Sequence, residues 1–221
     1  MTTMVCVARS GGRYDATWVE RLARGAKQHI GGLERIVCLT DLPLAIPGVA
    51  RVPLRHDWPT WWAKMEAFRA GIATGRTALV DLDTLFVGDA STLFAGDGVL
   101  ALEDFFHHGR LSSAVMAFDA GSLSYVYERF AADPERWMAP GSCGRAPNAV
   151  HGDQVVIDYL LREAGEPVGF WQQQRENPIE FYNPHRTLRG PVVVFIGPDK
   201  PDTAPAHTRA IWRGERTALA A

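Results

Sequence analysis

Residues 77–87 read Thr77-Ala78-Leu79-Val80-Asp81-Leu82-Asp83-Thr84-Leu85-Phe86-Val87, an apolar run that contains two carboxylates one residue apart. If the run is a buried strand, alternate side chains point to opposite faces, so Asp81 and Asp83 share a direction while Leu82 points back into the protein. Neighbouring carboxylates repel unless a positive charge lies between them, and hard divalent cations prefer carboxylate oxygens. The stretch therefore predicts a metal site, and with it an enzyme that acts on a phosphate-bearing substrate.

The bulk composition is typical of a globular protein. The 221 residues are 47% apolar and 22% charged, with a formal net charge of −2 and three cysteines that share no metal-binding spacing. The near-neutral charge argues against non-specific binding to nucleic acid or to an anionic membrane. We find no apolar run long enough for a membrane span and no signal-peptide pattern, so we expect a cytoplasmic protein without a membrane span.

Strand-like and helix-like patterns alternate over the first eighty residues. The predicted elements are strands at 4–8, 36–39 and 49–54, helices at 14–29 and 58–73, and then the strand that runs into Asp81 and Asp83. This alternation predicts an α/β fold in which a single mixed, mostly parallel central sheet is flanked by helices, with a Rossmann-like N-terminal half. No linker divides the chain, so we expect one domain over residues 1–221.

The second half is less regular. We expect strands at 99–102, 114–118 and 192–196, helices at 122–132 and 154–163, a flexible loop at 133–151 and an irregular tail after residue 201. Ligands of open α/β sheets bind beyond the carboxyl ends of the strands. The polar segments Ser10-Gly11-Gly12, Thr40-Asp41 and Asp81-Leu82-Asp83 each follow a predicted strand, so they should meet in one crevice.

Two classes of enzyme place an aspartate pair after a strand. One is the nucleotide-sugar-dependent glycosyltransferases of the GT-A type, and the other is the haloacid-dehalogenase-like phosphatases, in which the first aspartate is the nucleophile. The phosphatases need a lysine between their two acidic motifs. The lysines here are Lys27, Lys64 and Lys200, none of them between Asp83 and the later acidic segment at Asp153. The lysine positions therefore favour the glycosyltransferase.

Several segments resemble, in order, the glycogenin-like, galactosyltransferase-type retaining family of GT-A glycosyltransferases and its small bacterial and phage relatives. They are the βα unit that ends at Thr40-Asp41, Trp61-Trp62-Ala63-Lys64-Met65-Glu66, Leu79-Val80-Asp81-Leu82-Asp83-Thr84, Leu111-Ser112-Ser113-Ala114-Val115-Met116-Ala117-Phe118, Gly152-Asp153-Gln154 and Gly197-Pro198-Asp199-Lys200-Pro201. The resemblance implies transfer of a sugar from a nucleoside diphosphate sugar, most often a UDP-sugar, to an acceptor hydroxyl. A non-catalytic nucleotide-sugar-binding module is the alternative.

The resemblance also implies that residues 1–83 bind the nucleotide and residues 84–221 bind sugar and acceptor. It further implies roles for individual residues. Asp81 and Asp83 would hold Mn²⁺ or Mg²⁺ as a Lewis acid on the donor diphosphate, and lysines would stabilise the charge that develops on it. The catalytic residues would be Asp153, Gln154 and Lys64. The donor-binding residues would be Ala8, Ser10, Asp41, Lys64, Asp81, Leu82, Asp83, Ser113, Gly197 and Lys200.

Some assignments stay open on the sequence. Asp153 precedes an apolar run, so it could also be a helix N-cap, and Glu103, Asp104 and Asp153 are not distinguished as a general base. Relatives carry a histidine metal ligand just before the glycine of Gly-x-x-Lys-Pro, where this chain has Val194-Phe195-Ile196. A third ligand could then come from His185, from His207 or from water.

The acceptor is also open: a glycan, a small molecule, a protein or a modified nucleic-acid base. A basic acceptor groove could be built from Arg136, Arg145, Arg162 and Arg175. Trp61 and Trp62 are adjacent in a predicted helix and cannot both face inward, so one of them should be exposed toward a ligand or another surface.

Overall fold

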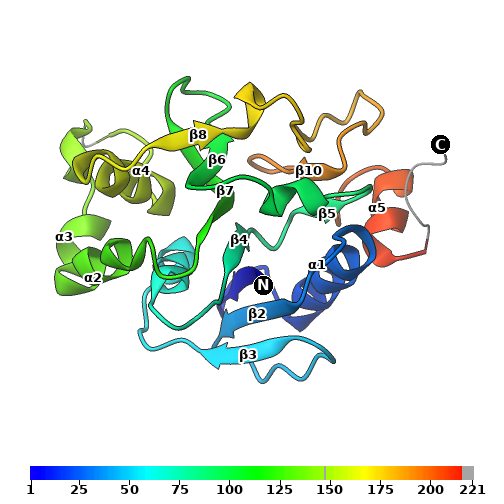
Figure 1. The fold of residues 1–221 in the computed structure, drawn as a ribbon, viewed down its shortest axis with the longest axis horizontal. Coiled ribbons are helices and arrows are strands. Elements are labelled where there is room, and N and C mark those ends of the chain that lie inside the picture. Colours follow the sequence, from blue (N-terminus) through cyan, green and yellow to red (C-terminus); the bar gives the residue numbers. More distant parts are fainter. Residues whose placement is uncertain (147, 216–221) are drawn as a thin grey trace.

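The computed structural model describes residues 1–146 and 148–215. Its centre is a seven-stranded sheet in the order β3-β2-β1-β4-β7-β6-β8 (Figure 1). These strands are β1 (Thr2–Ala8), β2 (Arg35–Thr40), β3 (Ala50–Pro53), β4 (Arg76–Val80), β6 (Val99–Glu103), β7 (Leu111–Asp119) and β8 (Val168–Phe170). Within this sheet β7 alone is antiparallel to its neighbours, so the predicted mixed, mostly parallel sheet is confirmed.

A second, three-stranded sheet and several helices complete the fold. The small sheet has the order β5-β10-β9, with strands β5 (Leu85–Phe86), β9 (Ile179–Phe181) and β10 (Val192–Val194). The α-helices are α1 (Ala16–His29), α2 (Ser124–Ala132), α3 (Pro134–Met138), α4 (Asp153–Glu163) and α5 (Ala206–Arg213). The 3₁₀-helices are η1 (Thr60–Phe68), η2 (Ser91–Phe94), η3 (Ser142–Gly144) and η4 (Trp171–Gln173).

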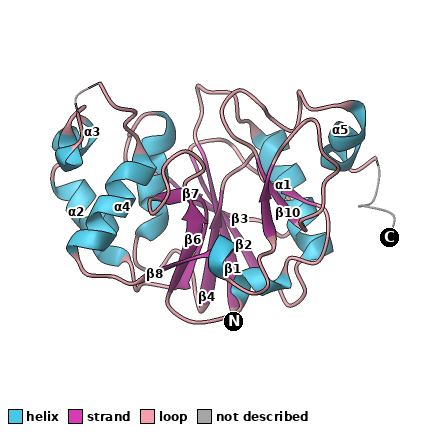
Figure 2. Cartoon of the chain, turned by 90° about the horizontal axis from the view of Figure 1, so that it is seen from above, coloured by secondary structure: helices cyan, strands magenta, loops and turns pink. Residues whose placement is uncertain are grey.

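Two apolar layers enclose the central sheet because side chains alternate along its strands. In β1, Met4 and Cys6 pack with buried residues of α1, whereas Val5 packs with those of η1, α2 and α4. Accordingly α1 and α5 lie on one side of the sheet and α2 and α4 on the other (Figure 2). Among the described residues, no helix is both long and apolar enough to cross a membrane.

The helix predicted at 58–73 is wrong in length and type, because the structure has the nine-residue 3₁₀-helix η1. Its start is unusual, since Thr60 has a positive φ of 52°. Its course is set by the fully buried carboxylate of Glu66, which accepts hydrogen bonds from the N–H groups of Arg55 and His56 and pairs with Arg69 at 3.0 Å. These tertiary contacts, rather than a 3.6-residue periodicity, fix the segment.

The predicted irregular tail is also wrong, because α5 lies within it. Ile211 and Trp212 are buried against α1, and the ring of Trp212 lies 4.6 Å from that of Trp18. Residues 216–221 of that tail lie outside the described residues. The segment 133–151, expected as a loop, contains the short helices α3 and η3.

Candidate functional site

The two aspartates lie in a turn after β4, so the predicted continuation of the strand through Asp83 is wrong. β4 ends at Val80, and the N–H of Thr84 donates to the carbonyl oxygen of Asp81 at 3.1 Å to close the turn. Leu82 is buried in the core, as predicted. The turn arises because the chain must leave the central sheet here to enter β5 of the small sheet.

Lys64 joins three elements of the fold. Its ammonium group lies 2.6 Å from Oδ1 of Asp81 at the end of β4 and 3.1 Å from Oδ2 of Asp153, the first residue of α4. The same group donates to the hydroxyl of Ser113 on β7 at 3.1 Å, and that hydroxyl donates to Oδ2 of Asp153 at 2.8 Å. Lys64, Asp81, Ser113 and Asp153 therefore form one connected cluster.

Burial and charge shift the titration of this cluster. Removal from water raises the pKa of Asp81 to about 6, with Lys64 opposing the shift and the carboxylates of Asp83 and Asp153 adding to it. Burial alone would lower the pKa of Lys64, but the carboxylates of Asp153 and Asp81 outweigh it and hold that pKa above its ordinary value. Lys64 therefore stays charged at neutral pH.

Asp83 is bound by side chains that do not belong to the lysine cluster. Lys200 places its ammonium group 2.7 Å from Oδ2 of Asp83, and the hydroxyl of Tyr14 donates to the same oxygen at 2.9 Å. Burial, together with the nearby carboxylate of Asp83, raises the pKa of Tyr14. Beside them Arg13 binds both carboxylate oxygens of Asp202, at 2.6 and 2.7 Å, so the loop after β1 meets the loop that carries Lys200.

A third polar group follows the carboxyl ends of β1 and β2. Asp41 accepts hydrogen bonds from the N–H of Ser10 at 2.8 Å and from its hydroxyl at 2.5 Å. Partial burial opposes them, yet these bonds lower the pKa of Asp41. Ala8 is fully buried at the end of β1. Among the described residues, no hydrogen bond or ion pair links Asp41 to the lysine cluster.

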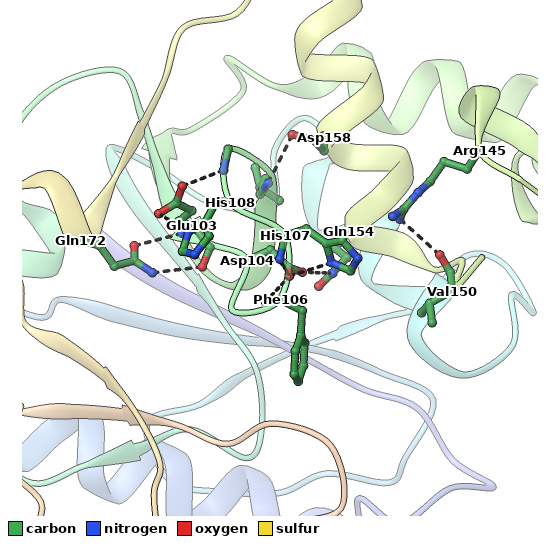
Figure 3. Close-up of polar contacts among 12 residues, drawn as sticks. Glu103, Asp104, Phe106, His107, His108, Arg145, Val150, Gln154, Asp158 and Gln172 are labelled. Atoms are coloured by element: carbon green, nitrogen blue, oxygen red, sulfur yellow. Dashed lines mark hydrogen bonds and ion pairs between the residues drawn. The ribbon is translucent and has the colours of Figure 1, made fainter.

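The start of α4 is tied to the loop after β6 (Figure 3). The amide of Gln154 donates to Oδ2 of Asp104 at 2.8 Å, and Oδ1 of Asp104 accepts the N–H groups of Phe106 and His107, each at 2.8 Å. These hydrogen bonds lower the pKa of Asp104 although its burial acts in the opposite sense. Asp104 is therefore a buried acceptor of hydrogen bonds that hold this loop against α4.

The N-cap interpretation of Asp153 is wrong. Gly152 is the N-cap of α4, and the carboxylate of Asp153 points to Lys64 and Ser113 rather than to the helix N–H groups. The exposed tryptophan lies next to this turn. A Cβ on Gly152 would come within 3.2 Å of the indole nitrogen of Trp61, which is 55% exposed while Trp62 is buried, as the sequence predicted for one of the two.

The site fits a hard divalent cation by charge and by donor type. Three carboxylates, those of Asp81, Asp83 and Asp153, share the two ammonium groups of Lys64 and Lys200, which leaves one negative charge uncompensated. No group of three or more His, Cys, Asp or Glu residues that could hold a metal occurs among the described residues. A cation here would rely on two protein carboxylates, with phosphate oxygens and water completing its shell, as is usual for Mg²⁺.

Ser113→Ala is expected to lower the free energy of unfolding by about 1–3 kcal/mol, because it leaves a buried oxygen of Asp153 without its hydroxyl donor. Ser112→Ala is the matched control, since Ser112 is the neighbour on the same strand and makes no side-chain hydrogen bond among the described residues. Thermal unfolding of both variants checks this. Equal losses in the two would show that the Ser113–Asp153 bond carries no stability.

Known proteins resemble this chain in structure only. No family model matches it, and no curated protein matches its sequence. The galactosyltransferase LgtC, solved with donor and acceptor sugar analogues, aligns over 99% of this chain and 97% of its own, with a TM-score of 0.66 and 12% identity. The glycosyltransferase GlyE of Streptococcus pneumoniae TIGR4 aligns over 95% of this chain and 58% of its own, with a TM-score of 0.66 and 15% identity.

This chain has the GT-A fold. The fold class predicted from the sequence is thereby confirmed, and so is the predicted resemblance at the level of the fold. The chain spans somewhat more than half of GlyE and nearly all of LgtC. At these identities the likeness establishes the arrangement of strands and helices and leaves the chemistry to the residues of the site.

Within the GT-A fold, contacts bring half of the predicted site residues together, in two groups. Direct contacts link Lys64, Asp81, Ser113 and Asp153, and other contacts link Lys200 to Asp83. Gly197, with a positive φ of 61°, lies in the loop that leads to Lys200. The sequence reasoning missed Tyr14 and the Arg13–Asp202 pair. Arg13 and Tyr14 come just after the glycines that follow β1, which is the signal that would have placed these two residues beside the predicted site.

Proposed function

We propose that this protein is a glycosyltransferase that moves a sugar from a nucleoside diphosphate sugar, a UDP-sugar in particular, to an acceptor hydroxyl. The observation that carries the proposal is the cluster at the edge of the sheet, in which three carboxylates are shared by Lys64 and Lys200. Such a cluster offers both signs of charge to one ligand: ammonium groups for a diphosphate and carboxylates for a cation and for sugar hydroxyls. The GT-A fold supports this assignment over the phosphatase alternative.

Residues 1–83 would bind the nucleotide and residues 84–221 the sugar and acceptor. The nucleoside would lie over the carboxyl ends of β1 and β2, beside Ala8, Ser10 and Asp41. The diphosphate would then reach the turn at Asp81 and Asp83. This order follows from the sheet, because β1 lies between β2 and β4 and the three strands end at one edge.

Asp81 and Asp83 would hold Mn²⁺ or Mg²⁺, which when bound acts as a Lewis acid on the diphosphate. Lys200 would exchange its contact with Asp83 for a phosphate oxygen, and it would stabilise the leaving diphosphate as negative charge develops. Lys64 stays with the cluster as a fixed positive charge. Both lysines are only slightly exposed, so water screens their charges weakly.

Asp153 and Gln154 would face the donor sugar. The carboxylate of Asp153 is held in place by Ser113 and Lys64, and the amide of Gln154 is oriented by Asp104. A carboxylate fixed in this way can accept hydrogen bonds from sugar hydroxyls or stabilise positive charge at the anomeric carbon. Because its position is fixed before the donor binds, little reorganisation is needed during the reaction.

Release of UDP from a panel of UDP-sugars tests this proposal. With Mn²⁺ or Mg²⁺ present we expect slow UDP release into water from at least one donor, faster release with an acceptor, and loss of both when EDTA removes the cation. Tight binding of UDP-sugars with no release under any condition would instead support the non-catalytic binding module. Absence of both binding and release would contradict a nucleotide-sugar site altogether.

A further inference from the structure

A large cavity lies outside the lysine cluster. Its volume is about 710 Å³, and its walls come from Phe105 in the loop after β6, from Glu180 and Phe181 of β9, and from residues 182, 183 and 185–189. Ligand pockets for small molecules are typically about 300–1,000 Å³, so this cavity has room for a mono- or disaccharide. Neither Asp81 nor Asp83 lines it.

Part of the cavity lining is aromatic, and hydrogen bonds outside the cavity fix the loop that carries Phe105. Phe105 is 55% exposed, and its ring meets that of Phe181 edge to face at 5.1 Å. The loop that carries Phe105 is fixed by Asp104, whose carboxylate accepts hydrogen bonds from the backbone N–H groups of Phe106 and His107 and from the side-chain amide of Gln154. The residue before Phe105 is therefore hydrogen-bonded to the residue that follows Asp153, and Figure 3 shows this bond between Asp104 and Gln154.

Part of the lining is cationic. Arg186 and Arg189 line the cavity, and neither side chain has an acidic partner within ion-pair distance among the described residues. Glu180 is the acid in the lining, and one of its oxygens already accepts the backbone N–H of Arg189 at 2.8 Å. The cavity therefore presents a surplus of positive charge.

The uncharged polar residues of the lining suit a saccharide. Asn183 and Thr187 line the cavity and offer an amide and a hydroxyl, which can exchange hydrogen bonds with sugar hydroxyls. Aromatic faces suit the apolar face of a sugar ring. Unpaired arginines favour a carboxylate or a phosphate, because guanidinium groups bind these anions through two parallel hydrogen bonds.

We propose that this cavity binds the acceptor, and that the acceptor is a saccharide carrying a carboxylate or phosphate group. The inference rests on the proposed glycosyltransferase function and gives it a substrate class. It also replaces the basic groove expected from the sequence. Arg162 pairs with Asp158, Arg136 lies over Trp137, and the cationic part of the lining is formed by Arg186 and Arg189 instead.

Binding of matched probe pairs to the full chain tests the assignment. One pair is 4-nitrophenyl β-D-glucuronide against 4-nitrophenyl β-D-glucoside, and the other is glucose 6-phosphate against glucose. Calorimetric titration is done with and without saturating UDP, so that any binding at the donor site is recognised. We expect the anionic member of at least one pair to bind about tenfold more tightly, the effect of one charge-assisted hydrogen bond. The pair that shows the preference tells a carboxylate acceptor from a phosphate acceptor.

Three variants locate the effect. Arg186→Gln and Arg189→Gln should each reduce the preference for the anionic probe to about threefold or less. Arg55→Gln is the control, because Arg55 is exposed and does not line the cavity. Unfolding temperatures confirm that the variants fold. The assignment is wrong if neither pair shows a preference, or if the preference survives both cavity substitutions. UDP release is measured separately, so a failure here is distinguishable from a failure of the glycosyltransferase function.

Discussion

Asp83→Asn is expected to lower the rate of UDP release by about a hundredfold or more. Asparagine keeps the size of the side chain and can still accept the hydrogen bond from Tyr14, but it removes the negative charge that faces Lys200 and would bind the cation. Asp81→Asn should have an effect of the same order, because Asp81 and Asp83 act on one diphosphate. Steady-state UDP release at several Mn²⁺ concentrations measures both variants.

Asp97→Asn is the matched control for this experiment. Asp97 is exposed in the turn before β6 and makes no side-chain contact among the described residues, so its variant should keep the full rate. A loss that higher Mn²⁺ partly restores would indicate weakened metal binding. Unchanged rates and unchanged Mn²⁺ dependence in Asp81→Asn and Asp83→Asn would contradict the role given to the pair.

Lys64→Met should have the largest effect on stability, a loss of about 3–5 kcal/mol in the free energy of unfolding. The substitution removes the cation shared by Asp81 and Asp153 and leaves both carboxylates in a partly buried site without it. UDP release should be lost as well. Chemical denaturation and UDP release measure the two effects separately.

Two further variants separate the structural from the chemical role of Lys64. Adding Asp153→Asn to Lys64→Met removes one stranded charge, so it should restore part of the stability while leaving the protein inactive. Lys27→Met is the control, since Lys27 is exposed and donates only to the carbonyl oxygen of Pro47. If Lys64→Met unfolds no more easily than Lys27→Met, the cluster is not the buried ionic centre described here.

The sequence was sufficient for the elements whose patterns are local. The first strand and first helix were predicted because Met4–Ala8 is a continuous apolar run and because Trp18, Val19, Leu22 and Ala26 form one helical stripe, all buried on α1. The chain order of strands and helices then gave the parallel sheet. Short elements such as β5 and β9, with two or three residues each, carry too little periodicity to be recognised.

The site was only partly predictable, for physical reasons. The pairing of Asp81 with Lys64 and of Asp83 with Lys200 depends on the turn after β4, which the small sheet imposes from residues more than a hundred positions later. In the sequence, Asp104 looks like any solvent-exposed acidic residue of a loop. Only the fold shows that α4 places Gln154 within hydrogen-bond distance of it. The residues that line the cavity come from segments some eighty residues apart. No local sequence pattern therefore predicts that Arg186 and Arg189 line the same cavity as Phe105.

The most direct test of the central claim is the anomalous scattering of manganese in crystals grown with UDP and Mn²⁺. We predict one anomalous peak at coordination distance from the carboxylates of both Asp81 and Asp83, next to the diphosphate, with Lys200 turned toward a phosphate oxygen. A bound UDP whose diphosphate lies away from this turn, or a manganese peak coordinated by other residues, would contradict the account.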